Sequence, residues 1–108
     1  MGFVYILGDS DKEGYYKIGA TRGSLEKRIK HLQTGNSGQL FLINSHKTKH
    51  PFMIENMLHK RIAEKRVLNE WYLLSDDEVR TFSSECTKIE DIISSLEDND
   101  FFNKKLKD

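Results

Sequence analysis

Residues 2–21 read GFVYILGDSDKEGYYKIGAT, and the rest of the predicted architecture is built on them. Two runs rich in β-branched and aromatic residues, 3–7 and 15–20, flank a segment of Gly, Asp and Ser, a pattern typical of a β-hairpin. Alternation assigns Val4, Ile6, Tyr16, Ile18 and Ala20 to one face of the hairpin, and Phe3, Tyr5, Leu7, Tyr15, Lys17 and Gly19 to the other. Only the second face mixes polar and aromatic groups.

A helix, a third strand and a second helix are expected to follow the hairpin. Ser24 is suited to cap a helix whose apolar stripe is Leu25, Ile29 and Leu32, and Gly35 is suited to end it. The short apolar run 40–44 predicts the third strand. Pro51 predicts the first turn of the second helix, whose buried stripe would be Ile54, Met57, Leu58 and Ile62.

The C-terminal part reads as helical. The capping box of Ser75 and Glu78 predicts the start of a third helix. Its apolar side continues through Phe82, Cys86, Ile89, Ile93 and Leu96. A second capping box, Thr87 with Glu90, leaves open whether this stretch forms two helices with a bend. Residues 99–108 form a predicted tail that is either frayed or packed by its phenylalanines alone.

Length and composition limit the class of protein. With 108 residues and 37% hydrophobic content, the chain suits a single domain with a modest core, which we assign to residues 1–98. The single cysteine, Cys86, excludes an internal disulfide framework. No stretch approaches membrane-spanning length or resembles a signal peptide. We therefore predict a soluble intracellular protein, in the cytoplasm or nucleus of a host cell, without a membrane partner.

The formal net charge of zero hides an uneven distribution of charge. Residues 1–75 hold 12 Lys and Arg against 7 Asp and Glu, so the remainder of the chain is acidic. A cationic face on the first part would attract polyanions, whereas an ordinary solvated surface explains the same charges without a partner. The charge pattern alone leaves both interpretations open.

Five segments in a fixed order carry a family resemblance. GFVYIL, YYKIG, EKRIKHL, IENMLHKRI and NEWYLL closely resemble the small viral and phage branch of the GIY-YIG nuclease superfamily, which is often described as DNA-binding. The likeness covers residues 2 to about 82. It implies an α+β fold with a small antiparallel three-stranded sheet flanked by helices, in the order β-β-α-β-α-α. It also implies a metal-dependent endonuclease that hydrolyses phosphodiesters in DNA.

The resemblance assigns roles to single residues. Tyr5 stands at the tyrosine of the first motif half, Gly19 at the terminal glycine of the second half, and Arg28 at the helix arginine. Glu55 matches the metal-binding carboxylate. Lys17 departs from the motif, because it occupies the position of the second tyrosine. Tyr5, Lys17, Arg28 and Glu55 are expected to converge on one cavity with room for a phosphate and a metal ion.

The chemistry of phosphodiester cleavage tests these assignments. Arg28 offers a planar, permanently charged fork for a phosphate. Glu55 is a hard oxygen ligand suited to one Mg²⁺ or Mn²⁺, and a single carboxylate predicts weak metal binding without DNA. Tyr5 as a general base needs help, because a phenol with a pKa near 10 is protonated at neutral pH. An ammonium group from Lys17 on the same face is predicted to lower that pKa.

Two histidines and a set of cations complete the candidate site. His31 lies one helical turn beyond Arg28, and His59 lies one turn beyond Glu55. Each is a candidate for proton transfer or for donation to phosphate, or is an exposed residue without a role. The predicted nucleic-acid-binding residues are Lys17, Arg22, Lys27, Arg28 and Lys30. Trp71 and Tyr72 are best interpreted as core or edge aromatics.

Three functions stay open on the sequence alone. The first is a divalent-metal DNA endonuclease that nicks one strand per active site. The second is a DNA-binding module with weak or lost turnover, which the missing second motif tyrosine supports. The third is a protein-interaction derivative of the fold that uses its acidic helix. A homodimer is possible, since it would supply two cuts.

Overall fold

The computed structural model describes residues 1–97, so the predicted tail 99–108 lies outside the described residues. The elements are β1 (Gly2–Asp9), β2 (Tyr15–Thr21), α1 (Leu25–Thr34), β3 (Leu40–Thr48), α2 (Pro51–Arg61), a 3₁₀ turn (Ala63–Lys65), β4 (Arg66–Leu68), β5 (Trp71–Leu73), α3 (Asp76–Arg80) and α4 (Phe82–Glu97). The predicted hairpin and helices are confirmed, and the third strand runs further than predicted. Within the described range, no helix is long and apolar enough to cross a membrane.

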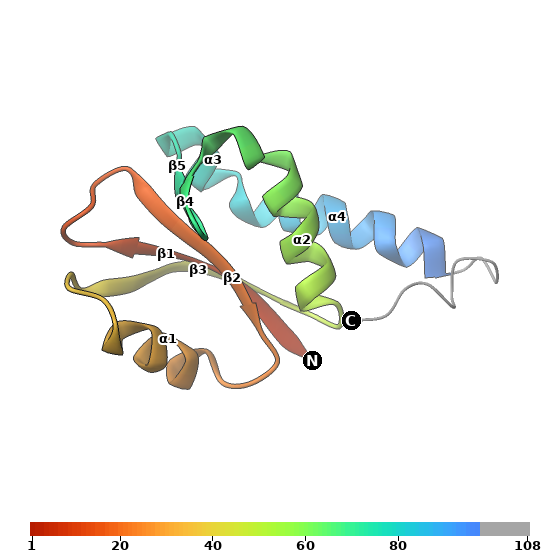
Figure 1. The fold of residues 1–108 in the computed structure, drawn as a ribbon. Coiled ribbons are helices and arrows are strands. Elements are labelled where there is room, and N and C mark those ends of the chain that lie inside the picture. Colours follow the sequence, from red (N-terminus) through yellow and green to blue (C-terminus); the bar gives the residue numbers. More distant parts are fainter. Residues whose placement is uncertain (98–108) are drawn as a thin grey trace.

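The sheet is antiparallel and has five strands in the order β3-β1-β2-β5-β4 (Figure 1). The α+β class is therefore confirmed, but the prediction of three strands is wrong. The sequence reading missed β4 and β5 because each has three residues, too few for an alternating pattern to stand out. The two strands join through Asn69, which has a positive φ of 52°, a conformation that asparagine tolerates in turns.

The two faces of the sheet carry different helices, as Figure 1 shows, with α1 on one side and α2 and α4 on the other. The strand register pairs Tyr5 with Gly19 and Ile6 with Ile18, which confirms the predicted separation of side chains. The larger core comprises Val4, Ile6, Ile18, Ile54, Leu58, Tyr72, Leu74, Phe82, Cys86, Ile89 and Ile93. On the opposite face, Tyr5, Leu7 and Leu40 pack with Leu25, Ile29, Leu32 and Trp71. Tyr72 and Trp71 are thus packing aromatics, as predicted.

The helix ends follow the predicted caps with one exception. Ser24 accepts a hydrogen bond from the backbone N–H of Lys27 at the start of α1. The capping box of Ser75 and Glu78 at the start of α3 has both of its hydrogen bonds. The helical stretch then breaks at Thr81, so the bend suggested at Thr87 and Glu90 is wrong. Thr87 lies inside α4 and donates its hydroxyl to the carbonyl of Ser83, a mid-helix alternative to capping.

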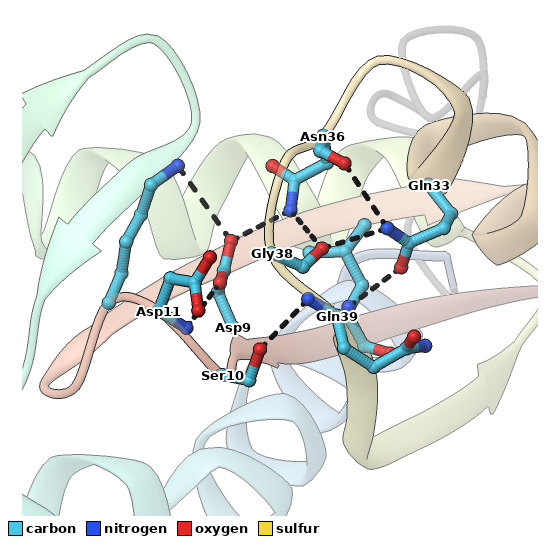
Figure 2. Close-up of polar contacts among 9 residues, drawn as sticks. Asp9, Ser10, Asp11, Gln33, Asn36, Gly38 and Gln39 are labelled. Atoms are coloured by element: carbon cyan, nitrogen blue, oxygen red, sulfur yellow. Dashed lines mark hydrogen bonds and ion pairs between the residues drawn. The ribbon is translucent and has the colours of Figure 1, made fainter.

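A buried carboxylate ties the loop after α1 to the end of β1 (Figure 2). Asp9 is 4% exposed and accepts hydrogen bonds from the side-chain amide of Asn36 and the backbone N–H of Asp11, both at 2.8 Å. The amide of Gln33 donates to the carbonyl of Gly38 at 2.8 Å. The hydrogen bond from Asn36 is the main reason that the pKa of Asp9 is lowered. This network holds the C-terminal end of α1 at a defined place on the sheet.

Candidate functional site

The side chain of Tyr5 extends from β1 across the backbone of β2. A Cβ atom built on Gly19 would lie 2.4 Å from Oη and 2.6 Å from Cζ of Tyr5. Side chains do not approach that closely, so residue 19 must lack a Cβ for the tyrosine to lie in this position. The requirement for glycine at the end of the second motif half is therefore one of space.

Arg28 reaches the tyrosine hydroxyl from α1. Its Nε donates a hydrogen bond to Oη of Tyr5 at 3.3 Å, across 23 positions of sequence. The apolar stripe of α1 packs on the Tyr5 face of the sheet, which directs the half-buried Arg28 toward the hydroxyl. Because the phenol oxygen accepts this bond, its own hydrogen stays available to donate to a ligand. The bond with Tyr5 is the main cause that raises the pKa of Arg28.

The phenol of Tyr5 is stabilised in its neutral form. Burial is the largest cause that raises its pKa, and the charges of Glu70 and Glu55 act in the same direction. Arg28 opposes this effect but does not reverse it. The net pKa of Tyr5 is thus raised, whereas the sequence predicted that Lys17 would lower it. The Lys17 ammonium instead lies 3.6 Å from Oε2 of Glu70, which offsets its charge.

Helix α2 approaches the same place from the other side of β2. His59 Nε2 lies 2.9 Å from the backbone carbonyl oxygen of Ile18, and since a carbonyl only accepts, Nε2 carries the hydrogen of this bond. Strand β5 pairs with residues 15–17 of β2 alone, so the carbonyl of Ile18 lies where the pairing ends. The ring of His59 also lies 5.3 Å from that of Tyr72. These contacts hold α2 against β2.

Glu55 stands one turn before His59 on the same helix and is half-buried. Burial is the largest cause that raises its pKa, Glu70 adds to the rise, and the charges of His59 and Arg28 oppose it. The charge of Glu55 in turn acts on Tyr5 and on Arg28. The charges of Glu55 and Arg28 therefore act on each other and on Tyr5.

Glu70 belongs to this neighbourhood and was missed in the sequence reading. It lies in the turn between β4 and β5, and its charge acts on Tyr5, Arg28 and Glu55. Its backbone carbonyl accepts a hydrogen bond from the N–H of Ile18 at 3.4 Å. The only signal in the sequence was its place inside the quoted segment NEWYLL. Nothing local indicated that this turn folds back onto β2.

The site offers few protein ligands for a divalent cation. Among the described residues, no group of three His, Cys, Asp or Glu side chains is placed to hold a metal ion. Glu55 is nevertheless a half-buried oxygen donor whose charge is disfavoured by burial and by Glu70, a situation that a cation would relieve. Mg²⁺ commonly keeps several waters and binds through one or two carboxylates and substrate phosphates. The residues present fit that weak mode of binding.

The remaining predicted residues lie on α1 and in the loop before it. Lys27, Lys30 and His31 are exposed on α1, and Lys30 lies 3.8 Å from Glu26 of the same helix. Arg22 lies over the ring of Phe52, 5.6 Å from its centroid. The side chain of His31 makes no hydrogen bond or ion pair with residues 1–97. The structure thus brings Tyr5, Arg28, Glu55 and His59 together with Gly19 and Glu70, and leaves His31 outside.

Comparison with known families gives one match. The model of the T5orf172 domain matches residues 2–90, a range that contains every residue of the site described above. No curated protein and no solved structure matches the chain. Because the family match spans well over half of the sequence, the protein belongs to the T5orf172 domain family.

Proposed function

We propose that the protein is a divalent-metal-dependent DNA endonuclease of the GIY-YIG type, which hydrolyses or nicks a phosphodiester beside β2. The T5orf172 family is associated with nuclease-like and DNA-binding roles. The single observation that carries the finer proposal is the hydrogen bond of 3.3 Å from Arg28 to the hydroxyl of Tyr5, whose pKa is also raised by the charge of Glu55. An arginine, a phenol and a carboxylate are groups that phosphodiester hydrolysis needs.

Arg28 and Tyr5 would bind the phosphate. The guanidinium keeps its charge at any physiological pH and offers donors in a rigid fork, which suits the growing charge on phosphoryl oxygens. Tyr5 would act as a neutral hydrogen-bond donor to a phosphoryl or leaving oxygen. Its pKa is raised, and its oxygen already accepts a hydrogen bond from Arg28, so its own hydrogen is available to donate. This assigns the phenol to stabilisation rather than to proton removal.

Glu55 and His59 would serve the opposite side of the phosphate. Glu55 is the residue that would hold Mg²⁺ or Mn²⁺, and Glu70 is a further carboxylate whose charge acts on it. When bound, the cation would supply Lewis acidity that offsets charge on the phosphoryl oxygens. His59 positions the helix through its bond to Ile18, which leaves Nδ1 as the only ring nitrogen able to accept a proton.

A DNA-binding module without turnover is the second candidate. Two observations favour it: Lys17 stands where the motif has its second tyrosine, and the pKa of Tyr5 is raised, which makes its phenol still harder to deprotonate. Such a module would keep the cationic side chains of α1 and bind DNA in a salt-sensitive manner. It would not cut.

A plasmid assay separates the two candidates. Supercoiled plasmid is incubated with the protein in Mg²⁺, in Mn²⁺ and in a chelator, and then with Glu55→Gln and Arg28→Ala. Lys88→Ala is the control, because Lys88 is an exposed cation on α4, whose core side packs on the sheet face opposite to α1. The endonuclease requires nicking that needs the metal, is lost in both site variants and survives in the control. Retention of the plasmid without any nick would reject the endonuclease in favour of the binding module.

A further inference from the structure

The face of the sheet that carries Tyr5 continues beyond the site toward β4. Lys17 pairs with Trp71 across β2 and β5, and Trp71 pairs with Leu68 across β5 and β4, so all three side chains share that face. Helix α1 packs over the part that contains Tyr5, Leu7 and Leu40. Leu68 and its neighbour Val67 are 64% and 57% exposed. Large apolar side chains therefore face solvent directly beside the candidate site.

These exposed residues line a hollow of about 270 Å³. Its walls are formed by Lys12, Tyr15, Val67, Leu68 and Trp71. The lining combines two aromatic rings, two aliphatic side chains and one cation. The Nζ of Lys12 lies 4.5 Å from the centroid of the Trp71 ring, and the Nζ of Lys17 lies 5.6 Å from it. The hollow is thus apolar inside, with two ammonium groups beside it, which lie 3.7 Å from Asp9 and 3.6 Å from Glu70 respectively.

Lys17 connects the hollow with the candidate site. Its ammonium lies 3.6 Å from Glu70, and the charge of Glu70 acts on Tyr5, Arg28 and Glu55. A phosphate at Arg28 and a group in the hollow would therefore be held by adjoining parts of one sheet face. A flat or apolar occupant suits the rings, and anionic groups attached to it would compete with Asp9 and Glu70 for the two lysines.

We propose that this hollow receives an unpaired nucleobase of the DNA strand whose phosphate lies at Tyr5 and Arg28, an inference that rests on the proposed function. Bases stack on exposed aromatic side chains of open sheets, while lysines beside them pair with the backbone. A base inside a duplex is stacked on its neighbours and has no free face for Trp71 or Tyr15. The preferred substrate is accordingly DNA with an unpaired stretch beside the cut, such as a single strand, a flap or a frayed end.

Trp71 reports directly on the hollow, because it is the only tryptophan of the chain. Its emission is followed in chelator while the full-length protein is titrated with oligothymidylate, and in parallel with an abasic deoxyribose-phosphate oligomer of equal length. The proposal expects quenching by oligothymidylate alone and about tenfold tighter binding than to the abasic oligomer. Equal affinities with unchanged emission would overturn it, and would leave the hollow to an apolar group of a protein partner.

A pair of neighbouring tyrosines supplies the matched variants. Tyr15 lines the hollow, whereas Tyr16 packs against the larger core on the opposite face. Tyr15→Leu is expected to weaken oligothymidylate binding about tenfold and leave abasic binding unchanged, while Tyr16→Leu changes neither. Equal losses in the two variants would reject a specific role of the hollow.

The outcome for the hollow is separable from that for the proposed function. If the plasmid is nicked in a manner that depends on Glu55 and Arg28 while the two oligomers bind equally, the base site is wrong and the endonuclease stands. If the plasmid is not nicked but oligothymidylate quenches Trp71, the base site stands in a binding module. If the protein neither nicks plasmid nor binds either oligomer, both proposals are wrong.

Discussion

Tyr5 and Gly19 form a direct cross-strand pair, and the hydroxyl of the tyrosine occupies the space that a side chain on Gly19 would fill. Gly19→Ala is therefore expected to displace Tyr5 from Arg28, with loss of nicking and a destabilisation of about 1–3 kcal/mol from overpacking. Gly35→Ala is the control, because a Cβ at Gly35 meets nothing within 4 Å. Nicking rates and thermal melts of both variants provide the measurement, and an active Gly19→Ala protein would contradict the role of the glycine.

Removal of the Tyr5 hydroxyl isolates its contribution as a donor. Tyr5→Phe keeps the ring that packs on the second core and removes the group that meets Arg28. The nicking rate is expected to fall about 10²-fold, the effect of losing one donor to a transition-state oxygen. Because the pKa of Tyr5 is raised above 10.0, its ionisation should not contribute to the pH dependence of the rate near neutral pH. The pH–rate profiles of the wild type and Tyr5→Phe should therefore have the same shape there, without a rise with pH that is present only in the wild type. A rise of this kind in the wild type alone would indicate that Tyr5 acts as a general base.

Glu55 is expected to destabilise the folded protein at neutral pH, where it is charged. Its pKa is raised in the folded state, so the folded protein favours the neutral acid, and this stabilisation is lost as the pH rises through the folded pKa. Glu55→Gln should therefore be more stable than the wild type at neutral pH, with a difference that disappears below the ordinary pKa of 4.5. Urea denaturation across a pH series measures this difference.

The same variant tests the metal without reference to activity. Mn²⁺ binds the folded protein at Glu55 in our proposal, so it should raise the melting temperature of the wild type and have a smaller effect on Glu55→Gln. Equal rises in the two proteins would exclude Glu55 as a ligand. The comparison is made without DNA, where a single carboxylate predicts weak binding and millimolar metal is required.

Lys17 is expected to leave the titration of the site unchanged. Its ammonium is paired with Glu70 at 3.6 Å, and it is not among the groups that shift the pKa of Tyr5. The pH–rate profiles of the wild type and of Lys17→Met should therefore have the same shape, although their amplitudes can differ through DNA binding. A profile displaced along the pH axis in Lys17→Met would restore the original hypothesis that Lys17 tunes the phenol.

Asp9 is expected to stabilise the position of α1 from a distance. Asp9→Asn replaces an acceptor of the Asn36 and Asp11 hydrogen bonds and should destabilise the protein by about 1–3 kcal/mol. The pKa of Asp9 is lowered, so its stabilisation is present above the unfolded pKa and is lost as the pH falls through the folded value. The difference in urea stability between the wild type and Asp9→Asn should shrink in acid. Asp11→Asn, which changes an exposed carboxylate, is the control.

The parts that the sequence predicted depend on short-range rules. Strand alternation separated Tyr5 and Gly19 from Ile6 and Ile18, and the register confirmed it. The caps at Ser24 and Ser75 located two helix starts, because capping requires only residues three positions apart. The suggested cap at Thr87 was wrong because the same spacing also occurs inside helices. There the threonine hydroxyl donates to a carbonyl of the preceding turn, as Thr87 does to Ser83 in α4.

Local sequence patterns were sufficient to predict the hairpin, the helix starts and the spacing that keeps Glu55 and His59 on one side of α2. They did not predict that the turn with Glu70 returns to β2, that Lys17 pairs with Glu70 there, or that the pKa of Tyr5 is raised, because these follow from tertiary contacts. Strand alternation and helix caps depend on residues a few positions apart in the sequence. Burial and electrostatic effects depend on groups that are distant in the chain and meet only in the folded protein. The acid–base character of the site is therefore a property of the folded protein.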